Sequence, residues 1–349
     1  MNRPNIHKTT FDKTFTYLHL YRASIKAKRN VGWKNSVQKY NAKRNIYLSI
    51  TLTKLRNGTY RSKGFYSFTK VERGKPRLIR SNHISERVVQ KALCDYYLIP
   101  LLRKKTIYDN GATLSHKGCE FVINRAKLFA RKCARLGKPI YFLTMDFHSY
   151  FDNINHEMLL KSIRRYCFDD KLFALITHFV KCFGNKGLGL GSQVSQICAI
   201  FYTHEIDNLI KHELRFKYYV RYMDDSLIMS DSKEKLQYAL EQIKEVCIKN
   251  DIILNESKTL ISKNRCSFLK RQWITITNSK RLIVKPNKDS YYRMFRKIKI
   301  FMKWKMPLEN IETSFQSWRS HFMKDNAKIL VNKANIKYNK LKEKYYDYN

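Results

Sequence analysis

The period of the apolar positions changes several times along the chain, and each period predicts a different element. Residues 1–60 have helical spacing, carry many cations and end at "LRNGTY". The segment "SFTKVERGKPRLIRS" alternates apolar and cationic residues around a Gly-Lys-Pro turn, which predicts a β-hairpin. "ISERVVQKALCDYYLIPLL" then predicts a helix capped by Ser85, and "CEFVINRAKLFARKCARL" predicts a second helix closed by Gly137.

The second half of the chain alternates short apolar runs with helical patterns. "PIYFLTMDFHSYFD" predicts a buried strand that ends at Asp146, and "YYVRYMDDSLIMS" predicts a hairpin. Between them lie two helical segments, a glycine-rich loop "GNKGLGLGSQ" and the helix "VSQICAIFYTHEIDNLIKH". The helix "SKEKLQYALEQIKEVCIKN" and the strand "IILNESKTLIS" complete a βαβ-like pattern, and "RCSFLKRQWITIT" predicts a further hairpin. From Pro286 a basic, all-helical tail follows, broken once at Pro307.

The charge balance points to a polyanionic partner. The 349 residues include 69 Lys and Arg against 28 Asp and Glu, a formal net charge of +41. Such an excess favours nucleic acid binding, although Lys codons in an AT-rich genome are an alternative source of it. Because 44% of the residues are hydrophobic and 13% aromatic, the chain is not a disordered basic tail. Its length suits two or three domains or one multi-lobed fold.

The cysteines and the hydropathy exclude several other classes. None of the eight cysteines has the CxxC spacing, so a zinc finger or ribbon is not expected. No apolar run reaches the length of a membrane span, and the first residues lack the apolar core of a signal peptide. These features predict a cytoplasmic protein with reduced thiols and no membrane partner.

Three carboxylates stand where apolar runs end. Adjacent side chains of a strand point to opposite faces, so Asp224 and Asp225 can serve one site only at a turn. Asp146 ends a separate apolar strand, and it joins them if the strands are neighbours in one sheet. Such a cluster needs cations, and oxygen ligands alone favour Mg²⁺, with two ions roughly 3.5–4 Å apart. In a strongly basic chain this arrangement predicts nucleotidyl transfer; the alternative is a set of ordinary turn acids.

An ordered set of motifs resembles the reverse transcriptases. "YMDD" resembles their C motif, "MDFHSYFDNINH" the A motif, "GLGLGSQVSQ" the B motif, "LNESKT" the D motif and "SFLKRQW" the E motif, while "GKPRLI" and "ISERVVQ" resemble the finger motifs. The resemblance covers residues 60–345 and is closest to compact prokaryotic enzymes: the diversity-generating-retroelement, retron-like and defence-associated groups. It implies an α+β right-hand polymerase fold. Its parts would be an N-terminal helical basic extension (1–60), fingers (61–138), a palm with an antiparallel sheet (139–285, with a finger insertion at about 155–185) and a short helical thumb (286–349).

The resemblance also implies roles for individual residues. Asp146, Asp224 and Asp225 would be catalytic, and with the Phe147 carbonyl they would bind two Mg²⁺ ions, Mn²⁺ being an alternative. The expected nucleotide-binding residues are Arg77, Lys117, Phe151, Gly191, Gln196 and Lys258. The expected nucleic-acid-binding residues are Lys270, Arg271, Arg293, Arg296 and Lys297.

Some of these positions carry sharper expectations. Phe151 would act as a steric gate against a ribose 2′-hydroxyl, the alternative being an ordinary core phenylalanine. Lys258 is either a proton donor to pyrophosphate or a surface lysine. Leu190 stands where many relatives have Gln, as in error-prone members of the family, so lowered fidelity is a hypothesis that Leu190→Gln tests. Lys270 departs from the usual Phe-Leu-Gly, which weakens the primer-grip assignment.

The expected activity is RNA-directed DNA synthesis, the extension of a primer 3′-hydroxyl with dNTPs. The partners would be an RNA template, a DNA or RNA primer and a cognate non-coding RNA, with partner proteins from neighbouring genes left open. Two alternatives remain: an RNA-dependent RNA polymerase, and a non-catalytic module that binds structured RNA. The sequence does not decide among phage defence, diversity generation and a retron.

Overall fold

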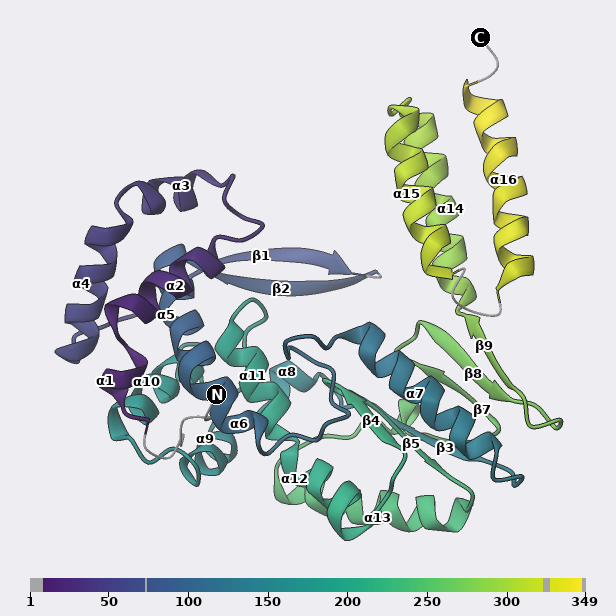
Figure 1. Ribbon diagram of the computed structural model, residues 1–349, viewed down its shortest axis with the longest axis horizontal. Helices are drawn as coiled ribbons and strands as arrows, with labels where there is room; N and C mark the ends of the chain where they lie inside the picture. Colours follow the sequence, from purple (N-terminus) through teal and green to yellow (C-terminus); the bar gives the residue numbers. More distant parts are fainter. Residues whose placement is uncertain (1–8, 73, 323–326, 347–349) are drawn as a thin grey trace. The chain divides into compact units, whose positions relative to one another are not determined.

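The computed structural model describes residues 9–72, 74–322 and 327–346, which divide into two compact units (Figure 1). Unit 1 consists of Met1–Gly118, Phe147–Arg215 and Leu240–Asn255. Unit 2 consists of Cys119–Asp146, Phe216–Ala239 and Glu256–Asn349. Each unit is thus built from three separate chain segments, and α13 (Lys233–Lys249) contributes residues to both. No helix in the described ranges is both long and apolar enough to cross a bilayer.

Unit 1 is mostly helical, as the spacing of its apolar residues predicts. Its helices are α1 (Phe11–Thr14), α2 (Tyr17–Ala27), α3 (Asn35–Ala42), α4 (Arg44–Arg56), α5 (Ile84–Leu93), α6 (Ile99–Arg103), α8 (Tyr150–Asn153), α9 (His156–Arg164), α10 (Asp170–Lys181), α11 (Gln193–Tyr202) and α12 (His204–Asn208). Two π-helical turns, η2 (Cys94–Leu98) and η3 (Leu209–Glu213), extend α5 and α12.

The predicted hairpin of unit 1 is confirmed, but its turn is displaced. Strands β1 (Phe65–Glu72) and β2 (Lys75–Asn82) pair in antiparallel register as far as Glu72↔Lys75. Lys75 and Pro76 therefore belong to β2, and Gly74 at the turn has a left-handed φ of +78°. Pro76 is tolerated because a two-stranded ribbon leaves edge positions without a ladder partner.

The N-cap expected at Ser85 is wrong. Helix α5 begins at Ile84, and its N-cap is His83, whose ring nitrogen accepts a hydrogen bond from the Ser85 backbone N–H. A histidine ring can fill this role because one neutral ring nitrogen is an acceptor. Pro100 stands near the start of α6, directly after the π-helical turn η2.

Unit 2 contains the antiparallel sheet that positions the acidic residues. Its strand order is β4 (Tyr219–Tyr222), β5 (Asp225–Ser230), β3 (Tyr141–Met145) and β6 (Leu260–Lys263). Strands β5 and β6 flank β3 and both run antiparallel to it, so the predicted βαβ-like pattern is present with β3 between its strands. Helix α7 (Cys119–Ala134) packs its buried face against β4 and β5 (Figure 1).

The C-terminal part of the prediction needs three corrections. The strand expected over 252–262 is only β6, because a 3₁₀ turn, η4 (Glu256–Lys258), precedes it. The hairpin of β7 (Arg265–Phe268) and β8 (Gln272–Ile276) has a third strand, β9 (Leu282–Pro286). The helical tail is interrupted twice, since α15 (Leu308–Phe322) and α16 (Lys328–Tyr346) follow α14 (Lys288–Lys303) as separate helices.

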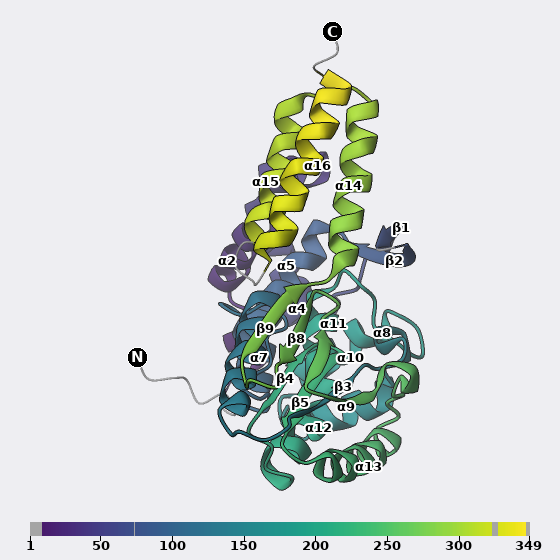
Figure 2. The same cartoon turned by 90° about the vertical axis from the view of Figure 1, so that its right-hand side faces the viewer.

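These last three helices form a small bundle with its own core (Figure 2). Phe295, Phe315 and Trp318 lie in that core, and the Phe315 ring stacks on Tyr338 with centroids 4.2 Å apart. Phe295 is thus a core residue rather than a surface aromatic, whereas Trp304 is 72% exposed.

Candidate active site

The three aspartates expected to be catalytic lie at one end of strands β3, β4 and β5 of the unit 2 sheet. We call this end of the sheet, with Asp146, Asp224 and Asp225, its acidic edge. Asp146 directly follows β3, whose last residue, Met145, pairs with Ser226 of β5. Asp225 is the first residue of β5 and pairs with Tyr222 of β4. Asp224 occupies the two-residue turn between those strands. Sheet pairing therefore brings together residues that are 78 or more positions apart in sequence, as 224 and 146 are.

The carboxylates at this edge interact electrostatically. The pKa of Asp225 is raised to about 7 by burial and by the neighbouring negative charges of Asp224 and Asp146. The cations of Lys270 and Lys258 oppose this rise. Asp146 itself is only 7% exposed, and the Lys258 ammonium forms an ion pair with its Oδ2. Lys258 is therefore a constituent of the acidic site and not an isolated surface lysine.

The site suits a hard divalent cation by its chemistry, although it is not a preformed ligand cluster. Within the described residues, no three His, Cys, Asp or Glu side chains are already gathered closely enough to hold a metal ion. Burial first, and then the charges of Asp224 and Asp146, raise the pKa of Asp225, and a bound Mg²⁺ would offset both effects. Asp146, Asp224 and Asp225 fit such an ion, and the Lys258 ammonium supplies positive charge at Asp146.

A buried arginine that the sequence patterns did not single out supports the acidic turn. Arg221, in β4, is 1% exposed, and its guanidinium donates a hydrogen bond of 3.0 Å to the Met223 carbonyl. Met223 has a left-handed φ of +53°, so the turn that carries Asp224 needs such support. The signal in the sequence was a single cation inside the otherwise apolar "YYVRYM".

The turn after β7 brings a second lysine to the site. Leu269 and Lys270 have φ values of +53° and +50°, a conformation that glycine adopts without strain. This conformation explains why glycine is usual in the motif, and Lys270 adopts it at the cost of strain. The Lys270 ammonium also opposes the rise in the pKa of Asp225. Lys270 and Arg271 follow β7 in that turn.

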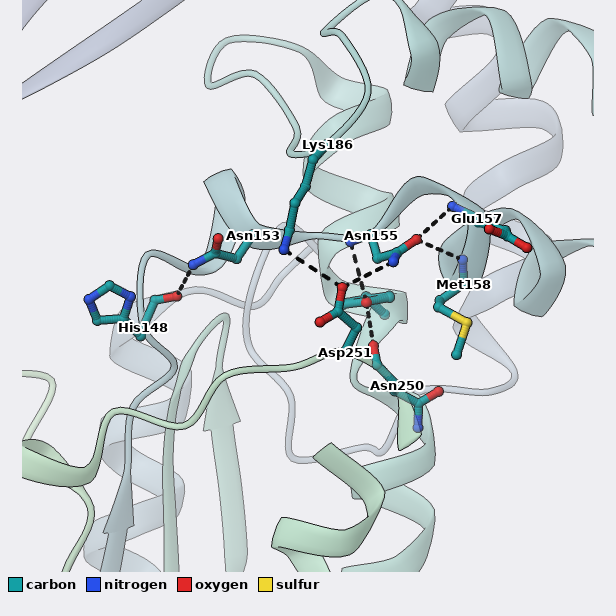
Figure 3. Close-up of polar contacts among 9 residues, drawn as sticks. His148, Asn153, Asn155, Glu157, Met158, Lys186, Asn250 and Asp251 are labelled. Carbon is teal, nitrogen blue, oxygen red and sulfur yellow. Dashed lines mark hydrogen bonds and ion pairs between the residues drawn. The ribbon is translucent and has the colours of Figure 1, made fainter. Parts of the chain in front are cut away.

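In unit 1, a polar network fixes the segment that carries Phe151 (Figure 3). The His148 carbonyl accepts a hydrogen bond from Asn153, and Asn155 caps α9 by accepting from the Glu157 and Met158 N–H groups. Asp251 accepts a 3.0 Å hydrogen bond from Asn155, and the Lys186 ammonium lies 3.6 Å from it.

Phe151 lies in α8 within this braced segment. Its side chain is only partly buried, and its carbonyl accepts a 2.7 Å hydrogen bond from the Leu188 N–H. The role of Phe151 as a steric gate stays a prediction. Phe147, the other predicted residue at this point of the chain, is 3% exposed.

The glycine-rich loop meets the hairpin of unit 1. The Arg80 N–H donates a 2.9 Å hydrogen bond to the Leu190 carbonyl, and a Cβ on Gly191 would lie 2.7 Å from the Arg80 carbonyl oxygen. The backbone of β2 at Arg80 therefore leaves no room for a side chain at Gly191. Gln196 follows in the first turns of α11, partly exposed, with Ser192 as the N-cap.

Substitution of Gly191 by Ala is expected to destabilise the fold. The new methyl would meet the Arg80 backbone, and φ at this position is +117°, so we expect a loss of about 2–3 kcal/mol in the free energy of unfolding. Gly184→Ala is the matched control, because Gly184 has a φ of +110° but no atom within 4 Å of its Cβ position. Urea denaturation of both variants measures the difference, and equal losses would show that the contact with β2 is unimportant.

The predicted phosphate-binding cations of unit 1 have partners within the protein. Arg77 lies on exposed β2 and pairs with Glu72 at 2.9 Å. Lys117 donates to the Tyr108 carbonyl and lies 4.5 Å from the centroid of the Tyr108 ring. Both roles remain predictions.

The predicted cations of α14 lie on its outer faces. Arg296 and Lys297 are exposed, and Lys297 donates to the Ser314 hydroxyl at 3.3 Å, while Arg293 pairs with Asp289 at 3.1 Å.

Comparison with known proteins identifies the family. Residues 68–270, more than half of the 349-residue chain, match the family model described as "Reverse transcriptase (RNA-dependent DNA polymerase)". The chain belongs to the reverse transcriptase family. The match includes most of the hairpin of unit 1, the acidic turn and Lys270, and the α+β fold class with antiparallel sheets agrees with it. The right-hand polymerase fold expected from the motifs is thus confirmed at the level of the family.

Solved structures that are similar to this chain include telomerases from two Candida species. The chain is 12% identical to telomerase from Candida albicans in complex with a TWJ fragment of telomeric RNA, covering 76% of this chain and 54% of that one at a TM-score of 0.49. It is 14% identical to apo telomerase from Candida tropicalis, covering 87% and 64% at a TM-score of 0.48. It is also 14% identical to apo telomerase from Candida tropicalis truncated from the C-terminal domain. That alignment covers 64% of this chain and 54% of the telomerase chain, at a TM-score of 0.47. The chain thus spans less than two thirds of each of these proteins, and no curated protein sequence matches it.

Proposed function

We propose that this reverse transcriptase family member is an RNA-directed DNA polymerase that extends a primer 3′-hydroxyl with dNTPs. The observation that carries the proposal is the convergence of Asp146, Asp224 and Asp225 at one edge of the unit 2 sheet. Burial of Asp225 and the neighbouring charges of Asp224 and Asp146 raise its pKa, and both effects favour a bound divalent cation.

The proposed roles of the individual residues are metal binding and proton donation. Asp146, Asp224 and Asp225, with the Phe147 carbonyl, would hold two Mg²⁺ ions, or Mn²⁺ as an alternative. Those ions, when bound, supply activation of the attacking hydroxyl and neutralisation of charge on the leaving pyrophosphate. Lys258 would position Asp146 by the ion pair that it already forms, and its ammonium is the proton donor proposed for pyrophosphate.

The proposed domain assignment remains that of a right hand. Fingers would comprise residues 61–138, the palm 139–285 with a finger insertion at about 155–185, and the thumb 286–349, after the extension 1–60. The basic α14 supports a role of the thumb in gripping a duplex backbone through Arg293, Arg296 and Lys297. Lys270 and Arg271 would contact the primer, and Arg77, Lys117, Gly191 and Gln196 the incoming nucleotide.

Phe151 would select deoxyribonucleotides by excluding a 2′-hydroxyl. Phe151→Val is therefore expected to raise the ratio of rNTP to dNTP incorporation by roughly 10–200-fold, the range that one removed steric contact yields. Phe151→Tyr, which keeps the ring, is the control and is expected to retain discrimination. Single-nucleotide incorporation kinetics measure both ratios, and an unchanged ratio in Phe151→Val would show that Phe151 is not the gate.

Primer extension by the purified chain tests the proposal. On an RNA template with Mg²⁺, dNTPs should yield full-length product and rNTPs should not. Efficient extension with rNTPs would instead indicate an RNA-dependent RNA polymerase. Extension with neither, by a protein that binds the RNA tightly, would indicate a non-catalytic module for structured RNA.

The biological setting is proposed from the motifs alone. A cognate non-coding RNA would be the template, in a phage-defence or retroelement system of a prokaryote, with partner proteins from neighbouring genes. Template, primer and dNTPs are cytoplasmic molecules in such a cell, which makes the cytoplasm the expected location. Leu190, where relatives have Gln, supports the hypothesis of lowered fidelity.

A further inference from the structure

The N-terminal helices of unit 1 carry a long acid-free stretch of positive charge. From residue 13 to residue 71 the sequence has no Asp or Glu. The same stretch contains fourteen basic residues: Lys13, Arg22, Lys26, Lys28, Arg29, Lys34, Lys39, Lys43, Arg44, Lys54, Arg56, Arg61, Lys63 and Lys70. Nearly all of it precedes the matched family region, which begins at residue 68.

A groove lies within this stretch, lined by residues from the end of α2 to α3. It is open to solvent and has a volume of about 400 Å³, within the roughly 300–1,000 Å³ of small-ligand sites. The lining residues are Ile25, Lys28, Arg29, Asn30, Gly32, Val37, Gln38 and Asn41. They combine two cations, three amides and a small apolar floor, with no carboxylate among them.

The two cations of the groove are available to a ligand. Arg29 is exposed and Lys28 partly so, and neither belongs to an ion pair with any described residue. Lys26, in the last turn of α2, is in contrast held by Asp95 at 2.7 Å. Unpaired cations suit a phosphate group, and the amide groups beside them can hydrogen-bond to the donors and acceptors of a base. Together they suit a nucleotide.

An exposed tryptophan is the next residue in sequence after the lining residue Gly32. Trp33 follows the lining residue Gly32 and is 75% exposed, with the Lys34 ammonium 5.6 Å from its ring centroid. Its carbonyl accepts a hydrogen bond of 3.5 Å from the lining residue Gln38. A large aromatic surface left in water beside free cations is the composition of a base-stacking site.

We infer that this groove binds an unpaired nucleotide of single-stranded RNA, at a site separate in sequence from the motifs of the polymerase. Lys28 and Arg29 bind the phosphate, Trp33 stacks on the base, and the amides of Asn30, Gln38 and Asn41 hydrogen-bond to the base edge. RNA is favoured over DNA because proteins read RNA chiefly through unstacked bases in single-stranded loops. The groove would thus hold a loop of the RNA that the enzyme copies or carries, an identity that rests on the proposed function.

Fluorescence anisotropy without dNTPs tests this site independently of any polymerase activity. The probe is a fluorescein-labelled RNA stem-loop with a randomised loop, compared with a fully paired RNA duplex and with the DNA version of the stem-loop. Trp33→Ala is expected to weaken stem-loop binding by about tenfold, while Trp33→Phe retains most of the affinity. Lys28→Gln with Arg29→Gln should lower the slope of log affinity against log salt by about 1.4, or 0.7 for each phosphate that is no longer neutralised.

The matched control is Lys54→Gln with Arg56→Gln, which removes the same charge from exposed positions of α4 outside the groove. We expect this control to weaken binding much less than the groove variants. Equal reductions in affinity in the two double variants, or equal affinity for the duplex, would overturn the inference in favour of a diffuse basic surface. Equal affinity for the DNA stem-loop would overturn the assignment to RNA.

Cross-linking provides a test that needs no variant. RNA with 4-thiouridine in the loop should cross-link to the tryptic peptide of residues 30–34, which contains Trp33 between the cleavage sites at Arg29 and Lys34. Cross-links found only in other peptides would contradict the proposed site. Because either result is obtained by binding alone, a failure of the proposed function would be seen separately, in primer extension.

Discussion

Asp224→Asn is expected to reduce dNTP incorporation by at least about a thousandfold. The substitution keeps the shape of the side chain but removes a negative charge at the sheet edge where Asp146 and Asp225 converge. If Asp224 is a metal ligand, as proposed, its removal forfeits several kcal/mol of transition-state stabilisation, and each 1.4 kcal/mol is about a factor of ten. Pre-steady-state incorporation of one dNTP on an RNA template measures the effect.

Asp231→Asn is the matched control for this prediction. Asp231 follows the other end of β5 and pairs with Lys138 at 3.6 Å, away from the acidic edge. Its substitution removes the same charge from the far end of the same strand and should leave incorporation within about threefold, the size of a surface effect below 1 kcal/mol. If Asp224→Asn and Asp231→Asn had equal activity, the acidic edge would not be the catalytic centre.

The second large effect concerns stability without divalent metal ions. Because the pKa of Asp225 is about 7 in the folded protein against 3.8 for the free side chain, the folded state holds this proton more tightly than the unfolded state. Stability from this group is therefore fully present below about pH 4 and is lost as the pH rises to just above 7. The decrease is a few kcal/mol, since one unit of pKa corresponds to about 1.4 kcal/mol.

Asp225→Asn isolates that contribution from the other titrating groups. In chelator-treated buffer the variant should be more stable than the wild type at pH 8, and the difference should shrink towards pH 4. Adding Mg²⁺ should stabilise the wild type more than the variant, because the ion binds only the folded wild-type site tightly. Thermal unfolding across pH gives these differences. A variant less stable than the wild type at pH 8 without metal would refute the assumed repulsion.

Local patterns predicted most elements of this fold but not all of their ends. The strand before Asp146 and the hairpin around Asp224 were predicted because a short apolar run that ends at a turn residue is typical of a buried strand. Strand β9 was missed, since its apolar run is short and lies between charged residues. The N-cap at His83 was missed because histidine is not among the usual capping residues.

Several side-chain and backbone contacts that depend on the folded conformation could not be predicted from local patterns. Lys258 and Asp146 pair across 112 positions, and only the order of the sheet brings them together. The role of Arg221 depends on a Met223 carbonyl whose direction is set by a left-handed φ. The contact of Gly191 with the Arg80 backbone likewise depends on how the glycine-rich loop meets β2. The residue type indicates what such a residue can bind, whereas the partner that it contacts depends on tertiary structure.

The most direct test of the central claim is single-nucleotide incorporation opposite each of the four RNA template bases. The wild-type chain, with Mg²⁺ and one dNTP at a time, should add the complementary nucleotide, and its choice should change whenever the template base is changed. A variant with Asp224→Ala and Asp225→Ala should add none. Incorporation that ignores the template base, or that persists in this variant, would contradict RNA-directed DNA synthesis by the acidic edge of the sheet.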